Sequence, residues 1–151
     1  MIKKKFLITD IDGTFFRSSL LIELLEEFIK TGLINADARN MYSKEHKAWH
    51  DRRGSYNDYI VAIVGCFEKN IIRIHHDDLV KASKEVVERN TNKVYHFTRS
   101  LIIQAKKDGY FLIIISHSPQ IILDIFGEKY GFDKVYGMTY EESNSRFTGK
   151  T

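Results

Sequence analysis

The stretch FLITDIDGTFFRSS, residues 6–19, decides how the rest of this chain is interpreted. Phe6–Thr9 is a short apolar run typical of a strand, and Asp10 and Asp12 follow it two residues apart. Side chains two residues apart on an extended segment point to the same side. The spacing predicts two neighbouring carboxylates at the carboxyl end of a buried strand, where ligands bind in open α/β sheets. Two crowded acids are costly unless a cation lies between them or one keeps its proton, and either arrangement is useful chemically.

The composition is that of an ordinary globular protein and argues against several classes of function. The chain has 151 residues, of which 43% are hydrophobic and 28% charged, and its net charge is +3. This charge is too small to argue for a nucleic-acid partner, and no apolar run is long enough to span a bilayer. The Lys3–Lys5 run predicts a solvated lead-in to the first strand and not a targeting signal. A single cysteine, Cys66, excludes an intramolecular disulfide and favours a cytoplasmic protein.

Helical periodicity dominates residues 18–93, with no strand pattern between them. Caps and apolar spacing predict four helices, over 19–31, from a cap at Asn35 to about 52, from a cap at Ser55 to about 69, and from 77 or 78 to about 90. The segment is therefore predicted to be a helical insertion.

After this insertion, the sequence predicts strands that alternate with helices. A helix is expected over 97–107, a β-branched strand buried on both faces over 110–115, a second helix ending near 130, a strand over 134–138 and a hairpin over 140–148. Ser118 suits the cap of the second helix and Pro119 its first position. This alternation predicts a parallel sheet with right-handed crossovers. About three core strands result, where a typical sheet has about five or six, so the α/β domain is expected to be incomplete.

Two motifs resemble those of a known family. Asp-x-Asp-Gly-Thr at residues 10–14 resembles the first motif of the haloacid dehalogenase superfamily, and IIISHSP at 113–119, with Ser116 ending its strand, resembles the second. KKDGYFLIIISHSPQIIL and YGFDKVYG are similar to the phosphoserine phosphatase-like branch, whose helical cap is inserted between these motifs. The resemblance implies a Rossmann-like parallel-sheet core over 1–17 and 94–151, with a helical cap over 18–93.

An anion site is expected where the two motifs meet. Ser116 offers a hydroxyl donor, and the free N–H groups at the start of the next helix point to the same place. The predicted phosphate contacts are Gly13, Thr14, Ser116 and His117. Thr14 is expected to position Asp12 or its loop. His117 either contacts substrate at the mouth of the site or is an exposed loop histidine.

The chemistry expected there is phosphoryl transfer to a carboxylate. Asp10 leaves the strand first and is the candidate nucleophile, which would form an aspartyl phosphate. Asp12 would protonate the leaving alkoxide and later activate water. By resemblance, Mg²⁺ is bound by the Asp10 carboxylate and the Asp12 main-chain carbonyl. The expected substrate is a small phosphorylated metabolite, with no membrane and no nucleic acid as partner.

The resemblance also implies residues that are not evident in the sequence. A lysine or arginine should follow the hairpin, and an acidic pair that completes the Mg²⁺ site should come later. Lys150 comes too early, so the chain is expected to be truncated before both motifs. It is then either an Mg²⁺-dependent phosphomonoester hydrolase that needs the missing motifs for activity, or a non-catalytic domain that binds a phosphorylated ligand or assembles with another chain. Arg17-Ser18-Ser19 carries no acid to hold a substrate amine, so phosphoserine itself does not follow.

Overall fold

The computed structural model describes residues 5–151, which form two compact units. The first contains residues 5–20 and 83–139, and the second contains residues 21–82 and 140–151. Lys3 and Lys4 of the expected lead-in lie outside the described residues. The units divide the chain at other points than the expected core and cap ranges. Those ranges stay a prediction, because compactness measures contacts and not how a domain is inserted.

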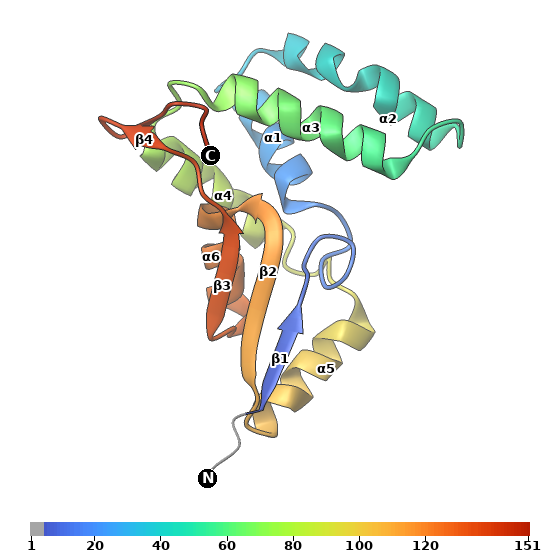
Figure 1. Cartoon of the computed structure of the whole chain (residues 1–151), viewed down its shortest axis with the longest axis vertical. Helices are drawn as coiled ribbons and strands as arrows, with labels where there is room; N and C mark the ends of the chain where they lie inside the picture. Colours follow the sequence, from blue (N-terminus) through green and yellow to red (C-terminus); the bar gives the residue numbers. More distant parts are fainter. Residues whose placement is uncertain (1–4) are drawn as a thin grey trace. The chain divides into compact units, whose positions relative to one another are not determined.

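The first unit is built on a parallel sheet with the strand order β1-β2-β3 (Figure 1). Its strands are β1 (Phe6–Thr9), β2 (Phe111–Pro119) and β3 (Lys134–Met138), and its helices are α5 (His96–Lys107), α6 (Gln120–Tyr130) and the second half of α4 (His76–Arg89). Phe6 pairs with Phe111, and Ile113 pairs with Lys134. The expected α/β class with a parallel sheet is confirmed.

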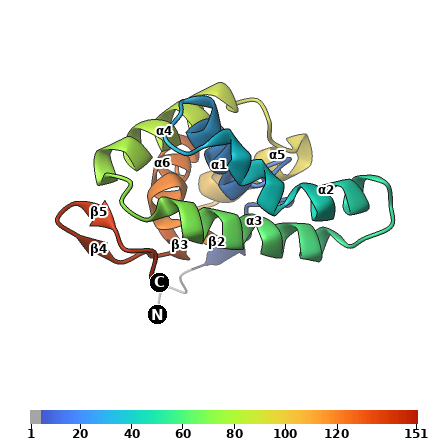
Figure 2. The same cartoon turned by 90° about the horizontal axis from the view of Figure 1, so that it is seen from above.

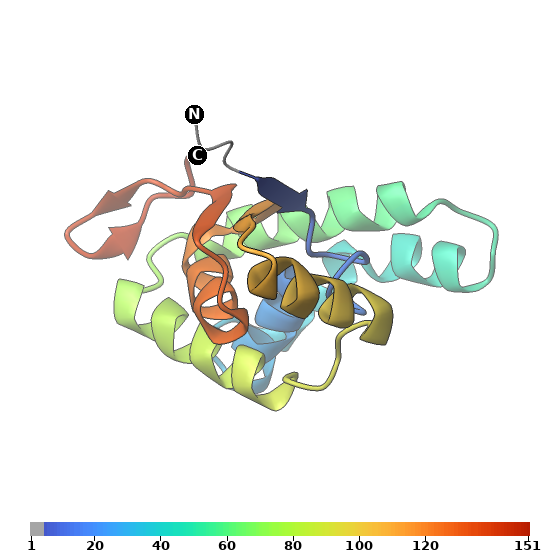
Figure 3. The same cartoon turned by 90° about the horizontal axis from the view of Figure 1, so that it is seen from below.

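One face of this sheet carries the core of the unit. Leu112 and Ile114 are fully buried, and they alternate along β2 with more exposed neighbours. Helices α5 and α6 lie on the same side of the strands (Figures 2 and 3). Helix α6 packs so closely that a Cβ added at Gly127 would lie 2.5 Å from Val135.

The opposite face of the sheet is exposed. Phe6, Ile8, Ile115 and Tyr136 are 53%, 61%, 53% and 53% exposed, respectively. The expectation of a strand buried on both faces over 110–115 is therefore wrong for β2, and β1, which was expected to be a buried strand, is largely exposed. The reason is the placement of α5 and α6, which cover the same face and leave the other to solvent.

Glycines in the left-handed conformation follow the ends of α5 and α6, as the sequence predicts. Gly109 follows α5 and Gly131 follows α6, each with a φ of 74°. This conformation costs glycine little because it has no Cβ. After α6, the Asp133 carboxylate accepts a hydrogen bond of 2.7 Å from the Leu112 N–H, which ties the β3 approach to the start of β2.

The second unit is helical and includes a small hairpin. Its elements are α1 (Leu20–Lys30) except for Leu20, which belongs to the first unit, the 3₁₀ helix η1 (Ala36–Met41), α2 (Ser43–His50), α3 (Tyr56–Ile71), the first half of α4, and strands β4 (Glu142–Ser143) and β5 (Arg146–Phe147). Figure 2 shows α2 beside α3. None of the described helices is long and apolar enough to cross a membrane.

The prediction of a single helix from Asn35 to about residue 52 is wrong, because the helix is interrupted at Tyr42. Tyr42 has a φ of −130° and separates η1 from α2. Its side chain is buried, and its hydroxyl donates to the Glu26 carboxylate on α1. Packing onto α1 therefore overrides the helical pattern.

The expected caps at Asn35 and Ser55 and the expected hairpin are confirmed. Asn35 accepts a hydrogen bond of 2.8 Å from the Asp37 N–H, and Ser55 accepts one of 3.1 Å from the Asp58 N–H. Hairpin β4-β5 turns through two left-handed residues, Asn144 and Ser145. The hairpin packs on the helices of its own unit, where Phe147 is buried and accepts a hydrogen bond of 2.9 Å from the Arg73 N–H.

Candidate functional site

The loop after β1 brings the first motif to the carboxyl end of the sheet. Asp10 is exposed, and its carboxylate accepts a hydrogen bond of 3.2 Å from the Thr14 hydroxyl. Thr14 therefore contacts Asp10 and not Asp12. Gly13 has a φ of 76° and donates its N–H to the carbonyl oxygens of Phe16, at 2.9 Å, and Ser18, at 3.1 Å. These two hydrogen bonds join Gly13 to later residues of the same loop and so close the loop.

Aromatic side chains anchor this loop to the core of the unit. Phe15 and Phe16 are fully buried. The Phe15 ring meets Phe126 and Tyr130 of α6 edge-on, at centroid distances of 5.6 and 4.9 Å. The Phe15 carbonyl accepts a hydrogen bond of 3.0 Å from the Tyr95 N–H. These contacts hold the loop against α6 and the start of α5.

The Asp12 carboxylate is the centre of the site. Its Oδ1 accepts a hydrogen bond of 2.6 Å from the Leu20 N–H, at the first residue of α1. Its Oδ2 accepts two hydroxyl hydrogen bonds, of 3.0 Å from Ser116 and 2.7 Å from Ser118. Both oxygens of Asp12 are therefore occupied by donors from the same unit.

Burial raises the pKa of the Asp12 carboxyl above its usual range. The hydrogen bonds from Ser118, Leu20 and Ser116 oppose this shift, and the nearby Asp10 charge adds to it. Desolvation is the largest of these effects. The neutral, protonated carboxyl is thereby favoured more than in an exposed aspartate, which suits a group that must give up a proton.

The second motif lies in an irregular part of β2. The pairing of β2 with β3 shifts between Ile115, opposite Tyr136, and Pro119, opposite Met138. Four steps along β2 thus match two along β3, as in a bulge, and bulges re-aim side chains beside functional sites. The strand continues through Pro119, so α6 begins at Gln120, one residue later than the expected first position at Pro119.

Ser118 is the residue whose role the sequence did not reveal. It was expected to cap α6, but the structure places Pro119 at the cap without a side-chain hydrogen bond. The Ser118 hydroxyl instead donates to Asp12. The alternation in Ser116-His117-Ser118 is the signal that could have found it, because residues two apart on an extended segment share a side.

The predicted site residues are only partly brought together. Ser116 joins Asp12 directly, and Thr14 joins Asp10. His117 lies between the two serines along the chain and its side chain is exposed. Its assignment to phosphate, like that of Gly13, stays a prediction.

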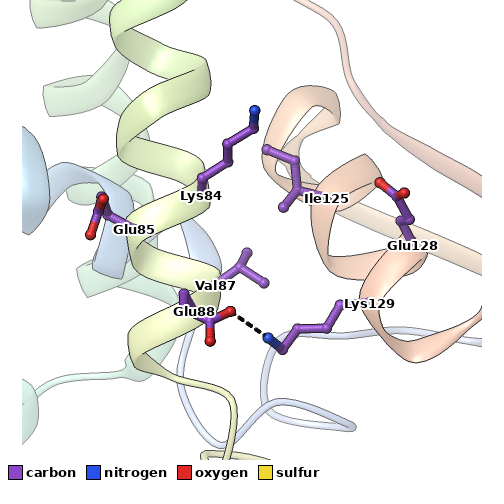
Figure 4. A pocket seen from close by; sticks show the side chains of 7 residues that line it. All are labelled: Lys84, Glu85, Val87, Glu88, Ile125, Glu128 and Lys129. Carbon is purple, nitrogen blue, oxygen red and sulfur yellow. Dashed lines mark hydrogen bonds and ion pairs between the residues drawn. The ribbon is translucent and has the colours of Figure 1, made fainter.

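A separate pocket lies between α4 and α6 in the same unit (Figure 4). Its volume is about 480 Å³, and it contains none of the predicted site residues. Val87 and Ile125 form its apolar part, and an ion pair of 2.7 Å joins Lys129 to Glu88 at one side. With acidic and basic side chains in near balance, this pocket does not select the charge of a ligand.

The site residues fit only part of an Mg²⁺ site. Mg²⁺ prefers six oxygen ligands in near-ideal octahedral geometry. The Asp10 carboxylate is exposed and suited to the ion, whereas the oxygens of the Asp12 carboxylate are held by Leu20, Ser116 and Ser118. For Asp12 this leaves the main-chain carbonyl. Among residues 5–151, no three His, Cys, Asp or Glu side chains group in a way that could hold a metal.

The sequence of this chain matches a known family over nearly its full length. The profile of the haloacid dehalogenase-like hydrolases matches residues 7–151. The chain belongs to this family. Among curated proteins, no significant sequence match was found for this haloacid dehalogenase-like chain.

Solved structures show the same fold at low sequence identity. A protein of unknown function from Bordetella pertussis Tohama I is similar with a TM-score of 0.73 and 10% identity, over 98% of this chain and 66% of that one. A phospho-aspartyl intermediate analogue of phosphoserine phosphatase has a TM-score of 0.58 and 18% identity, over 98% and 62%. A phosphoserine phosphohydrolase-like protein from Francisella tularensis has a TM-score of 0.60 and 14% identity, over 95% and 62%. This haloacid dehalogenase-like chain thus spans less than two thirds of these relatives.

Proposed function

We propose that this chain supplies the nucleophile and the general acid–base of a phosphomonoester hydrolase that acts on a small phosphorylated metabolite. The observation that carries the proposal is the partly buried Asp12 carboxyl, held by Ser116 and Ser118 beside the exposed Asp10. One exposed and one partly buried carboxyl in the same loop have different tendencies to hold a proton. Pairs of this kind divide acid and nucleophile roles in other hydrolases.

The two steps follow from this division of roles. An Asp10 carboxylate oxygen attacks phosphorus, the bond from phosphorus to the leaving oxygen breaks, and the Asp12 carboxyl gives its proton to that oxygen. The product is an aspartyl phosphate on Asp10. The Asp12 carboxylate then takes a proton from water, whose oxygen attacks phosphorus and releases phosphate from Asp10.

Mg²⁺ is proposed as the cofactor, with the Asp10 carboxylate and the Asp12 main-chain carbonyl among its ligands. When bound, the ion would screen the repulsion between the carboxylate and an anionic phosphate. The remaining Mg²⁺ ligands would have to come from groups other than Asp10 and Asp12. A proton on the Asp12 carboxyl would avoid a second negative charge beside Asp10.

Hydrolysis of p-nitrophenyl phosphate in the presence and absence of Mg²⁺ tests this proposal. Mg²⁺-dependent turnover that is abolished in Asp10→Asn supports the enzyme. Asp78→Asn, which alters an exposed aspartate on α4, is the matched control and is expected to retain turnover. Turnover that survives in Asp10→Asn would exclude Asp10 as the nucleophile.

A second function is a non-catalytic domain that binds a phosphorylated ligand. The observation that favours it is the incomplete metal site among residues 5–151. Binding of inorganic phosphate without turnover would select this function. Absence of both binding and turnover would refute the phosphate site altogether.

A further inference from the structure

The Ser116 hydroxyl is already committed inside the site. It donates to Asp12 Oδ2 at 3.0 Å and accepts a hydrogen bond of 3.1 Å from the Ser118 N–H. A serine hydroxyl has one hydrogen to donate. Ser116 therefore cannot donate to a phosphate oxygen while it donates to Asp12.

Release of Ser116 leaves the Asp12 carboxylate with a donor on each oxygen. Oδ1 keeps the Leu20 N–H at 2.6 Å, and Oδ2 keeps the Ser118 hydroxyl at 2.7 Å. Without Ser118, the same release would leave Oδ2 without the two hydroxyl partners seen here. A buried acceptor that loses its donors carries a desolvation cost.

The two serines differ in the way these roles require. Ser118 is 2% exposed and forms the shorter hydrogen bond to Asp12. Ser116 is partly exposed and forms the longer one. The serine that can reach solvent is therefore the one less tightly bound to the carboxylate.

We propose that Ser118 is a positioning residue that holds Asp12 while Ser116 turns its hydroxyl from Asp12 to a bound phosphate. This inference rests on the proposed function, since it requires phosphate at the Asp10–Asp12 site. Ser118 itself does not touch phosphate. It acts through Asp12, and its contribution appears only when Ser116 is present to be released.

A double-mutant cycle on phosphate affinity tests this dependence. Inorganic phosphate is titrated calorimetrically into the whole chain, Ser116→Ala, Ser118→Ala and the double variant. Ser118→Ala is expected to weaken binding about 2- to 13-fold when Ser116 is present, the equivalent of one hydrogen bond, and to have no effect in the Ser116→Ala background. Ser83→Ala removes another buried serine hydroxyl, on α4, and should leave affinity unchanged.

The outcomes separate this inference from the proposed function. An equal loss in both backgrounds, or no loss in either, overturns the role of Ser118 and leaves the phosphate site standing. If the unaltered chain does not bind phosphate, the proposed function fails first.

A measurement without substitution covers the case in which Ser118→Ala does not fold. Saturation with phosphate should shift the amide NMR signal of Ser118, because its acceptor on Ser116 moves. The signal of Leu20 should stay, because Asp12 keeps its place. A larger shift at Leu20 than at Ser118 would refute the inference.

Discussion

Two adjacent isoleucines on β2 provide a direct test of the one-sided sheet. Ile114 is fully buried, whereas Ile115 is 53% exposed. Ile114→Ala should lower the free energy of unfolding by about 2–5 kcal/mol, since it removes buried methyl groups and leaves a cavity. Full burial of such a side chain contributes about 1.5–3 kcal/mol, so at half exposure, with no cavity to form, Ile115→Ala should cost only about 1 kcal/mol.

The assay must report on the unit that contains β2. The single tryptophan, Trp49, lies in the other unit, so its fluorescence is the wrong probe. Urea unfolding followed by hydrogen exchange of the amides in β2 measures the right transition. Ile115→Ala serves as the matched control for Ile114→Ala on the same strand. Equal destabilisation by the two variants would show that both faces of the sheet are covered, which would refute the reasoning.

Two further predictions concern the site and the packing behind it. Because burial raises the pKa of Asp12, the folded chain binds this proton more tightly than the unfolded chain, and the contribution of Asp12 to the free energy of unfolding falls as pH rises from about 4 through the folded pKa. Asp12→Asn removes this loss, so urea midpoints of the variant should rise relative to the unaltered chain between acidic and neutral pH; a constant difference would contradict the burial argument. An added Cβ at Gly137 would lie 2.5 Å from Leu123 and 2.8 Å from the Ser118 carbonyl, so Gly137→Ala should lower the thermal midpoint by an amount equivalent to about 1–3 kcal/mol. Gly65→Ala in α3 meets no neighbour within 4 Å and should be neutral or stabilising, and similar midpoints for the two variants would show that the contact at Gly137 is not tight.

Local signals in the sequence identified most elements of the fold. Apolar periodicity and caps such as Asn35 and Ser55 act over a few residues, so their effects can be read without knowledge of the partner. The same holds for Gly131, which ends α6 in the left-handed conformation. The carboxylate pair and Ser116 were identified from their positions at strand ends.

The errors arose where distant partners decide the conformation. Tyr42 leaves the helical path because Glu26, on another helix, holds its hydroxyl. Ser118 looked like a helix cap because a serine before a proline suits one, but Asp12 captures its hydroxyl. The exposed face of the sheet could not be predicted for a related reason. Isoleucines such as Ile8 and Ile115 are typical of buried strands, and only the arrangement of the helices shows which face of the sheet is covered.

The pairing of β1 with β2 has a consequence for the synthesis of this chain. Phe6 lies opposite Phe111, so about 105 residues must be made before the first strand can meet its neighbour. At about 5–20 residues per second, translation leaves β1 without that partner for roughly 5–20 s. Loop closure over such a distance is also unfavourable in entropy and slows folding. The nascent β1, which carries Phe6 and Ile8, therefore stays without its strand partner for several seconds of synthesis.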